Sequence, residues 1–201
     1  MVLAYRVIFC LYGFWLPNDP RGSWSDFVGA WELVRFGRST QTHSRRSLAQ
    51  DRHDRELREA AKRALKYPPV ALTGLQARAV GRGFGEYVRK SGIVMHACSI
   101  LPAHVHGVIA RHTFQVEAIV NQLKGYATRQ LVAEGLHPLA AYAAPDPRPP
   151  SCWARGQWKV FMDSPDDIVR SCGYVVDNPE KEGLPPQTYP FVTPYVPTDP
   201  V

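Results

Sequence analysis

Hydrophobic and polar residues are arranged along the chain in patterns that predict seven elements. Residues 4–15 are almost continuously β-branched, aromatic and aliphatic, which is typical of a central strand covered on both faces. Two further apolar runs, 93–101 and 104–110, are separated only by Pro102 and Ala103. They therefore predict two strands joined as a tight hairpin.

Three other segments have apolar residues at helical spacing. Thr73 is a plausible N-cap for a helix through Lys90, and a second helix is expected over 114–133. The third helix opens with Ser164, followed by proline and acidic residues in the first turn, and should reach about residue 177. A short strand at 157–162 precedes it.

The predicted order is strand, helix, strand, strand, helix, strand, helix. This order indicates an α+β fold in which helices pack on an antiparallel, ferredoxin-like sheet. The length of 201 residues suits a single domain spanning 1–201. Residues 23–72 are polar, basic and weakly patterned apart from helical spacing at 54–65, so they are interpreted as an insertion after the first strand.

The charge balance favours a polyanionic partner. The chain has 24 Lys and Arg against 18 Asp and Glu, a net charge of +6 and a pI near 9.3. Basic residues crowd the stretch 35–66, where Arg45 and Arg46 are candidate phosphate contacts. Lys124 and Arg129 are further candidates. A solvated basic surface is the competing interpretation of all four.

The cysteines and the N-terminus exclude two classes of protein. Cys10, Cys98, Cys152 and Cys172 show no CxxC spacing, which indicates neither a zinc ribbon nor a disulfide framework. The apolar N-terminal run is interrupted by Arg6 and lacks a cleavage-site pattern. We therefore expect a cytoplasmic protein that does not span a membrane.

His104 and His106 are the sharpest local signal for chemistry. Two histidines separated by one hydrophobic residue on a strand point to the same face, with their Cα atoms about 7 Å apart. Such a pair can converge on one divalent ion. Taken alone, the pattern occurs often enough by chance that two ordinary surface or core histidines are the favoured interpretation.

A two-histidine site needs a further ligand and a reactive group. Tyr174 and Asn178 lie four residues apart on a predicted helix, so their side chains share one face. Tyr126 with Gln130 has the same spacing and is the competing pair.

The run Ile100-Leu-Pro-Ala-His-Val-His, followed by Tyr174-Val-Val-Asp-Asn-Pro-Glu-Lys-Glu-Gly-Leu184, resembles the HUH single-tyrosine transposases of the REP-associated (RAYT) branch, within the wider IS200-like transposases. The opening AYRVIFCLYGFWLPNDPRGSW looks like the first strand and loop of that group. The resemblance covers roughly 4–22 and 93–184, and it is poor over 23–72.

The resemblance implies a ferredoxin-like fold, a Mg²⁺ or Mn²⁺ ion and a covalent 5′-phosphotyrosine link to single-stranded or hairpin DNA. His104 and His106 become metal ligands, Tyr174 the nucleophile and Asn178 the third ligand, at a position where relatives often have glutamine. The family also suggests a homodimer, for which strands 93–110 would supply an exposed sheet edge.

Two alternatives remain open at this stage. The first is a domesticated, catalytically silent protein that binds nucleic-acid hairpins. The second is a metal-dependent phosphodiesterase that uses water as its nucleophile in place of Tyr174.

Overall fold

A four-stranded antiparallel sheet forms the centre of the protein. The computed structural model describes residues 1–14, 16–17, 31–37, 54–143 and 148–197. The strands are β1 (Ala4–Cys10), β2 (Met95–Ile100), β3 (His104–Ala110) and β4 (Trp158–Met162), in the order β2-β3-β1-β4. This is the ferredoxin-like order, so the predicted fold class is confirmed.

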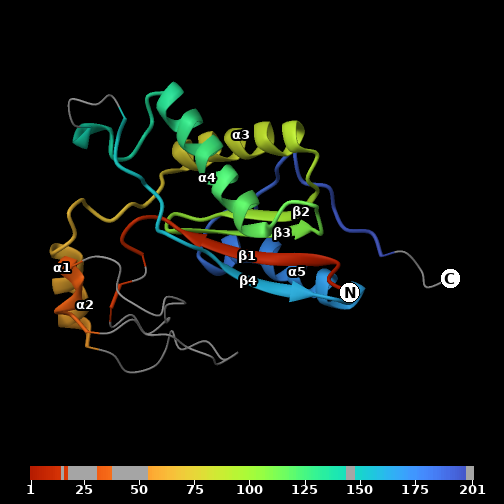
Figure 1. Cartoon of the computed structure of the whole chain (residues 1–201), viewed down its shortest axis with the longest axis horizontal. Helices are drawn as coiled ribbons and strands as arrows, with labels where there is room; N and C mark the ends of the chain where they lie inside the picture. The colour runs from red at the N-terminus through yellow and green to blue at the C-terminus, as the bar shows by residue number, and fades with distance from the viewer. Residues whose placement is uncertain (15, 18–30, 38–53, 144–147, 198–201) are drawn as a thin grey trace.

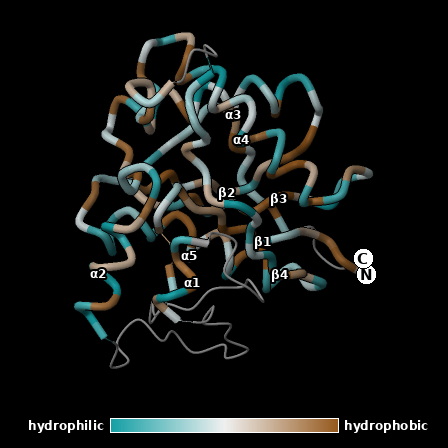
Figure 2. Tube along the Cα trace, turned by 60° about the vertical axis from the view of Figure 1, so that its left-hand side comes forward, coloured by the Kyte–Doolittle hydropathy of each residue, from teal (hydrophilic) through white to brown (hydrophobic). Residues whose placement is uncertain are grey.

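Helices cover both faces of the sheet (Figure 1). α3 (Gly74–Ser91) and α4 (Val116–Ala133) pack side by side on one face, and α5 (Pro165–Lys181) packs on the other. Hydrophobic and hydrophilic residues alternate along the strands and helices, as Figure 2 shows. The larger core lies under α3 and α4, whereas a smaller core lies between the sheet and α5.

Local sequence signals account for the ends of α3 and for its approach to α4. Thr73 and Gln76 form a reciprocal capping box, and Gly92 ends the helix in the left-handed conformation. A Cβ atom at Gly83 would lie 2.7 Å from the backbone of Ala127, so the two helices require glycine there. Both the predicted helix and the following hairpin are confirmed.

Two predicted boundaries were wrong. β1 ends at Cys10 instead of residue 15, because the chain turns near Gly13, whose φ is +82°. The last helix continues through Lys181 with Pro179 inside it. Proline lacks an N–H, but the final turn is held by bonds such as Leu184 N–H to the Pro179 carbonyl. Asn178 consequently lies within α5 and not at its end.

Part of the predicted insertion forms a small unit of its own. α1 (Trp31–Val34) and α2 (Arg55–Arg63) lie apart from the sheet in Figure 1. Their apolar residues gather in a separate cluster that includes Leu33, Phe36 and Ala61. The helical spacing expected at 54–65 is confirmed by α2, whereas Arg45 and Arg46 lie outside the described residues. The domain boundaries stay a prediction.

The C-terminal segment lies along the outer edge of β2. Val192 bridges Met95 in parallel, and the Gln187 side chain bonds both the N–H and the carbonyl of Ile100. The expectation of an exposed edge over 93–110 was therefore wrong, because backbone groups of β2 already have partners. Dimerisation itself stays a prediction.

A short 3-10 helix, Ala140–Tyr142, lies in the connection between α4 and β4. Across the described ranges, none of the helices combines the length and the apolar character needed to cross a membrane.

Candidate active site

The two histidines project from β3 toward α5. Val105, between them, packs in the larger core on the opposite face, and Val108 packs against Val175 of α5. The imidazole centroids of His104 and His106 are 4.8 Å apart. The predicted common face of the pair is thus observed.

α5 brings Tyr174 to this pair. The Tyr174 ring lies edge-on to His106, with centroids 5.6 Å apart and an interplanar angle of 70°. The tyrosine is 40% exposed, whereas Asn178, one turn later, is buried. The Asn178 Nδ2 atom donates to the Tyr174 carbonyl at 2.9 Å, which leaves Oδ1 as the atom able to act as a ligand. The structure therefore brings His104, His106 and Tyr174 together between β3 and α5, and it places Asn178 one turn after Tyr174 on the same helix.

His106 has the properties of a metal ligand. It is 3% exposed, and neither ring nitrogen has a hydrogen-bond partner among the described residues. Burial lowers its pKa to about 3, with smaller effects in the same direction from His104 and Arg6. The imidazole is therefore neutral at pH 7, as ligation requires, and buried nitrogens without partners fit a bound cation.

Ser99 of β2 lies directly opposite His106 in the sheet register. Its side chain is fully buried, and its Oγ atom has no hydrogen-bond partner in the part of the chain that the structure describes. Cross-strand pairs on one face have Cβ atoms about 5 Å apart. Two buried polar groups without partners therefore lie next to each other at the site.

Two cations that sequence reasoning missed flank the tyrosine. The Arg6 guanidinium lies 5.0 Å from the Tyr174 ring centroid and 5.1 Å from that of Trp158. The Lys181 ammonium lies 5.1 Å from the Tyr174 ring. Burial lowers the pKa of Arg6, whereas interaction with Tyr174 raises it. One available signal was an arginine inside an otherwise apolar strand, since such a charge needs a polar or aromatic partner.

Glu182, just after α5, was also missed. Its Oε1 atom lies 3.6 Å from His104 Nε2. It follows Tyr174 by eight residues, a spacing that returns to the same helix face. No group of three His, Cys, Asp or Glu side chains in the described residues is close enough to hold a metal. The predicted ligand set instead completes the histidine pair with an amide.

The competing pair, Tyr126 and Gln130, lies on α4 across the sheet from the histidines. Tyr126 packs on Tyr87 with ring centroids 5.2 Å apart, and Gln130 donates to Glu134. This location separates the competing pair from the histidines, which Tyr174 contacts.

Lys124 does not fit its predicted contact with phosphate, and that expectation was wrong. The side chain is buried, and its ammonium donates to the carbonyls of Ala154 and Gly156 at 3.0 and 2.7 Å. Burial lowers its pKa to about 8. Arg129 is exposed on α4, with its guanidinium 4.0 Å from the Tyr126 ring centroid, and is thus remote from the histidine pair.

The comparisons with known proteins found similarity only among solved structures. No protein-family profile matches the chain, and no curated protein matches it. A REP-associated tyrosine transposase bound to a REP hairpin superposes with a TM-score of 0.47 and 13% identity, covering 90% of this chain and 68% of that one. A proposed transposase from Deinococcus radiodurans gives a TM-score of 0.37 and 11% identity, covering 87% and 89%.

Both TM-scores lie below 0.5.

Proposed function

We propose that this chain is a metal-dependent tyrosine nuclease and strand transferase that acts on single-stranded, hairpin-bearing DNA through a covalent 5′-phosphotyrosine intermediate. The observation that carries the proposal is the contact between Tyr174 and His106, beside His104. A buried neutral imidazole next to a partly exposed phenol is an arrangement suited to phosphoryl transfer. The net charge of +6 suits a DNA substrate.

The tyrosine would act as the nucleophile. A bond forms between its Oη atom and phosphorus, the bond from phosphorus to the 3′ oxygen breaks, and the proton lost by the phenol is balanced by one gained at the 3′ oxygen. The phosphodiester is conserved in the link, so a 3′-hydroxyl can reverse the reaction without ATP. Arg6 and Lys181 supply positive charge where the phenol and phosphate meet.

His104, His106 and Asn178 would hold Mg²⁺ or Mn²⁺, with Glu182 close to His104. Such an ion polarises the scissile phosphate and neutralises charge on its oxygens. Neutral imidazoles and an amide leave most of the ion's charge available to the substrate. Burial of both His106 nitrogens without partners supports this assignment.

The test incubates labelled hairpin-bearing single strands with the protein and Mg²⁺ or Mn²⁺ and looks for an adduct that survives denaturation. We expect an adduct with the unmodified chain and none with Tyr174→Phe, while DNA binding persists in both. Tyr126→Phe is the matched control and should still form the adduct. Cleavage that persists in Tyr174→Phe would indicate water as the nucleophile, and binding without any adduct would indicate a silent hairpin-binding protein.

A further inference from the structure

A groove of about 570 Å³ lies between α3 and the C-terminal segment 188–191. It is separate from the histidine site, because α3 packs on the opposite face of the sheet from α5. One wall is a face of α3, and the other wall includes Tyr189 and Phe191.

Glycines on α3 make room for the aromatic wall. A Cβ atom at Gly81 would lie 2.9 Å from the Tyr189 ring, and one at Gly85 would lie 3.2 Å from the Phe191 ring. The two rings are stacked, with centroids 5.2 Å apart and an interplanar angle of 26°. The groove thus has a flat, largely apolar side built from π faces and glycine backbone.

A stripe of arginines borders this aromatic wall. Arg78, Arg82 and Arg89 line the groove, and all three are exposed. At about 100° per residue they fall within roughly 40° of one another around α3, and they span about 16 Å along it. The stripe therefore runs parallel to the groove.

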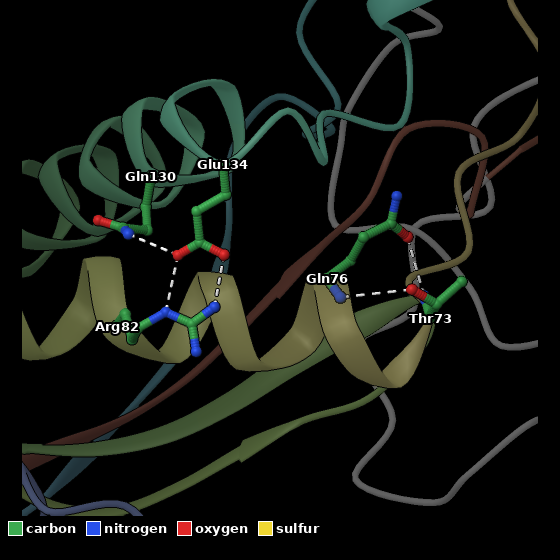
Figure 3. A network of polar contacts seen from close by, with 5 residues as sticks. All are labelled: Thr73, Gln76, Arg82, Gln130 and Glu134. Atoms are coloured by element: carbon green, nitrogen blue, oxygen red, sulfur yellow. Dashed lines mark hydrogen bonds and ion pairs between the residues drawn. The ribbon is translucent and has the colours of Figure 1, made fainter.

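The three arginines differ in their partners. Arg82 makes a two-bond ion pair with Glu134, the C-cap residue of α4, with N···O distances of 2.7 and 2.5 Å. Figure 3 shows this pair. In the described part of the chain, Arg78 and Arg89 make no ion pair. Their charges are available to an external anion.

We propose that this groove binds a segment of single-stranded DNA, with its phosphates along the arginine stripe and its bases against Tyr189 and Phe191. A positive groove combined with aromatic faces is the combination that binds single strands with little sequence preference. The choice of DNA over RNA rests on the proposed function, whereas the groove and its charge do not.

The sheet lies between this groove and His106, so a bound strand would contact the groove and the histidine site through different nucleotides. The stripe of about 16 Å along α3 is long enough to meet only a few successive phosphates of a single strand. The groove would therefore hold a segment that flanks the reacting phosphate, and binding should strengthen when an oligonucleotide is long enough to reach both places.

The experiment measures binding of fluorescently labelled single strands by anisotropy, in a Tyr174→Phe background so that no reaction intervenes. Arg78→Gln/Arg89→Gln should weaken binding about tenfold and should reduce the salt slope, log Kd against log salt, by about 1.4. Arg111→Gln/Arg155→Gln is the control, since it removes the same charge from exposed positions outside the groove.

An unchanged affinity and slope in Arg78→Gln/Arg89→Gln, or an equal loss in the control, would overturn the proposal. Tighter binding of RNA than of DNA of the same sequence would overturn the assignment to DNA. Ultraviolet crosslinking of halogenated single strands should label Tyr189 or Phe191, and labelling confined to other segments would contradict the groove.

The two proposals can fail separately. With Tyr174 intact, Arg78→Gln/Arg89→Gln should still form the covalent adduct at saturating DNA. If the unmodified chain forms no adduct but the groove variant loses binding, the nuclease proposal fails and the groove stands.

Discussion

The ring of Tyr174 lies edge-on against the imidazole of His106, with the two centroids 5.6 Å apart. Tyr174 comes from α5 and His106 from β3, so the contact depends on how α5 packs on the sheet. Val175 and Ile168 of α5 are buried against the sheet and fix the position of the helix. Helix packing therefore controls how a phenol approaches the histidine pair.

Arg6 should contribute to the rate of adduct formation. Its guanidinium lies 5.0 Å from the Tyr174 ring, where it can stabilise negative charge developing on the phenol and the phosphate. Arg6→Gln should slow single-turnover adduct formation by about 10²-fold, a typical effect of losing one charged group, and Arg6→Lys should restore part of the rate. Arg170→Gln, an exposed change one turn from Tyr174 on α5, is the control. Equal rates of adduct formation in Arg6→Gln and the control would show that Arg6 does not contribute to the reaction.

Features governed by local rules could be predicted from the sequence. The Thr73 capping box, the Ser164 N-cap and the common face of His104 and His106 each depend on residues within a few positions. Tyr174 and Asn178 were found in the same way, by helical spacing together with a family resemblance. Such rules do not depend on the rest of the fold.

Features that depend on tertiary packing could not be predicted. Arg6 meets Tyr174 only because the sheet places β1 beside β3, against which α5 packs, over a separation of 168 residues. Lys124 was expected at the surface, but α4 directs its long stem inward so that the ammonium reaches two loop carbonyls. The segment 187–193 has no periodic pattern, so its position on the edge of β2 had no sequence signal.

Ser99 lies opposite His106 and makes no hydrogen bond with the described residues, so its Oγ atom is free to bond the imidazole and orient it when a metal is bound. Histidine ligands usually bond a second group through the other ring nitrogen, and loss of that group typically weakens metal binding by about 10- to 100-fold. Ser99→Ala should weaken Mn²⁺ binding, measured by calorimetry or electron paramagnetic resonance, by about tenfold. The free energy of unfolding without metal should change by less than about 1 kcal/mol, because the Oγ atom has no partner to lose.

Ser171→Ala, a change at another buried serine, provides the comparison for Ser99. If both serine variants bind Mn²⁺ as tightly as the unmodified chain, Ser99 has no role in orienting the ligand.

Stability of the metal-free protein should fall as the pH is lowered through the range in which His106 titrates. Its pKa is about 3 in the fold, against an ordinary value near 6.5 in the unfolded chain. Below pH 6.5 the unfolded chain binds a proton that the folded chain does not, so the free energy of unfolding decreases by about 1.4 kcal/mol per pH unit. The stability associated with neutral, buried His106 is fully present above pH 6.5 and is lost progressively toward pH 3.

Urea unfolding at pH 4 to 7 in the presence of a chelator measures this dependence, with His106→Asn as the comparison. In the variant, the free energy of unfolding should fall less steeply as the pH is lowered, by about the 1.4 kcal/mol per pH unit that one proton contributes. Parallel curves for the two proteins would mean that His106 is as solvated in the fold as in the unfolded chain.

Gln187 should protect the edge of β2. Its Oε1 atom accepts from Ile100 N–H at 2.8 Å, and its Nε2 atom donates to the Ile100 carbonyl at 2.9 Å, so one side chain satisfies both edge groups. Tyr189 also donates to Oε1, which connects this edge to the aromatic wall of the groove. Gln187→Ala should lower the free energy of unfolding by about 1 to 3 kcal/mol, because buried backbone groups lose their partners.

The same substitution should promote association, because unpaired backbone groups on an edge strand are a template for pairing with another chain. Sedimentation velocity over a range of concentrations should detect self-association in Gln187→Ala that is greater than in Gln122→Ala, an exposed change on α4. Were the unmodified protein to dimerise through this edge, Gln187→Ala would weaken the dimer or leave it unchanged. The direction of the change in association therefore distinguishes a capped edge from a dimer interface.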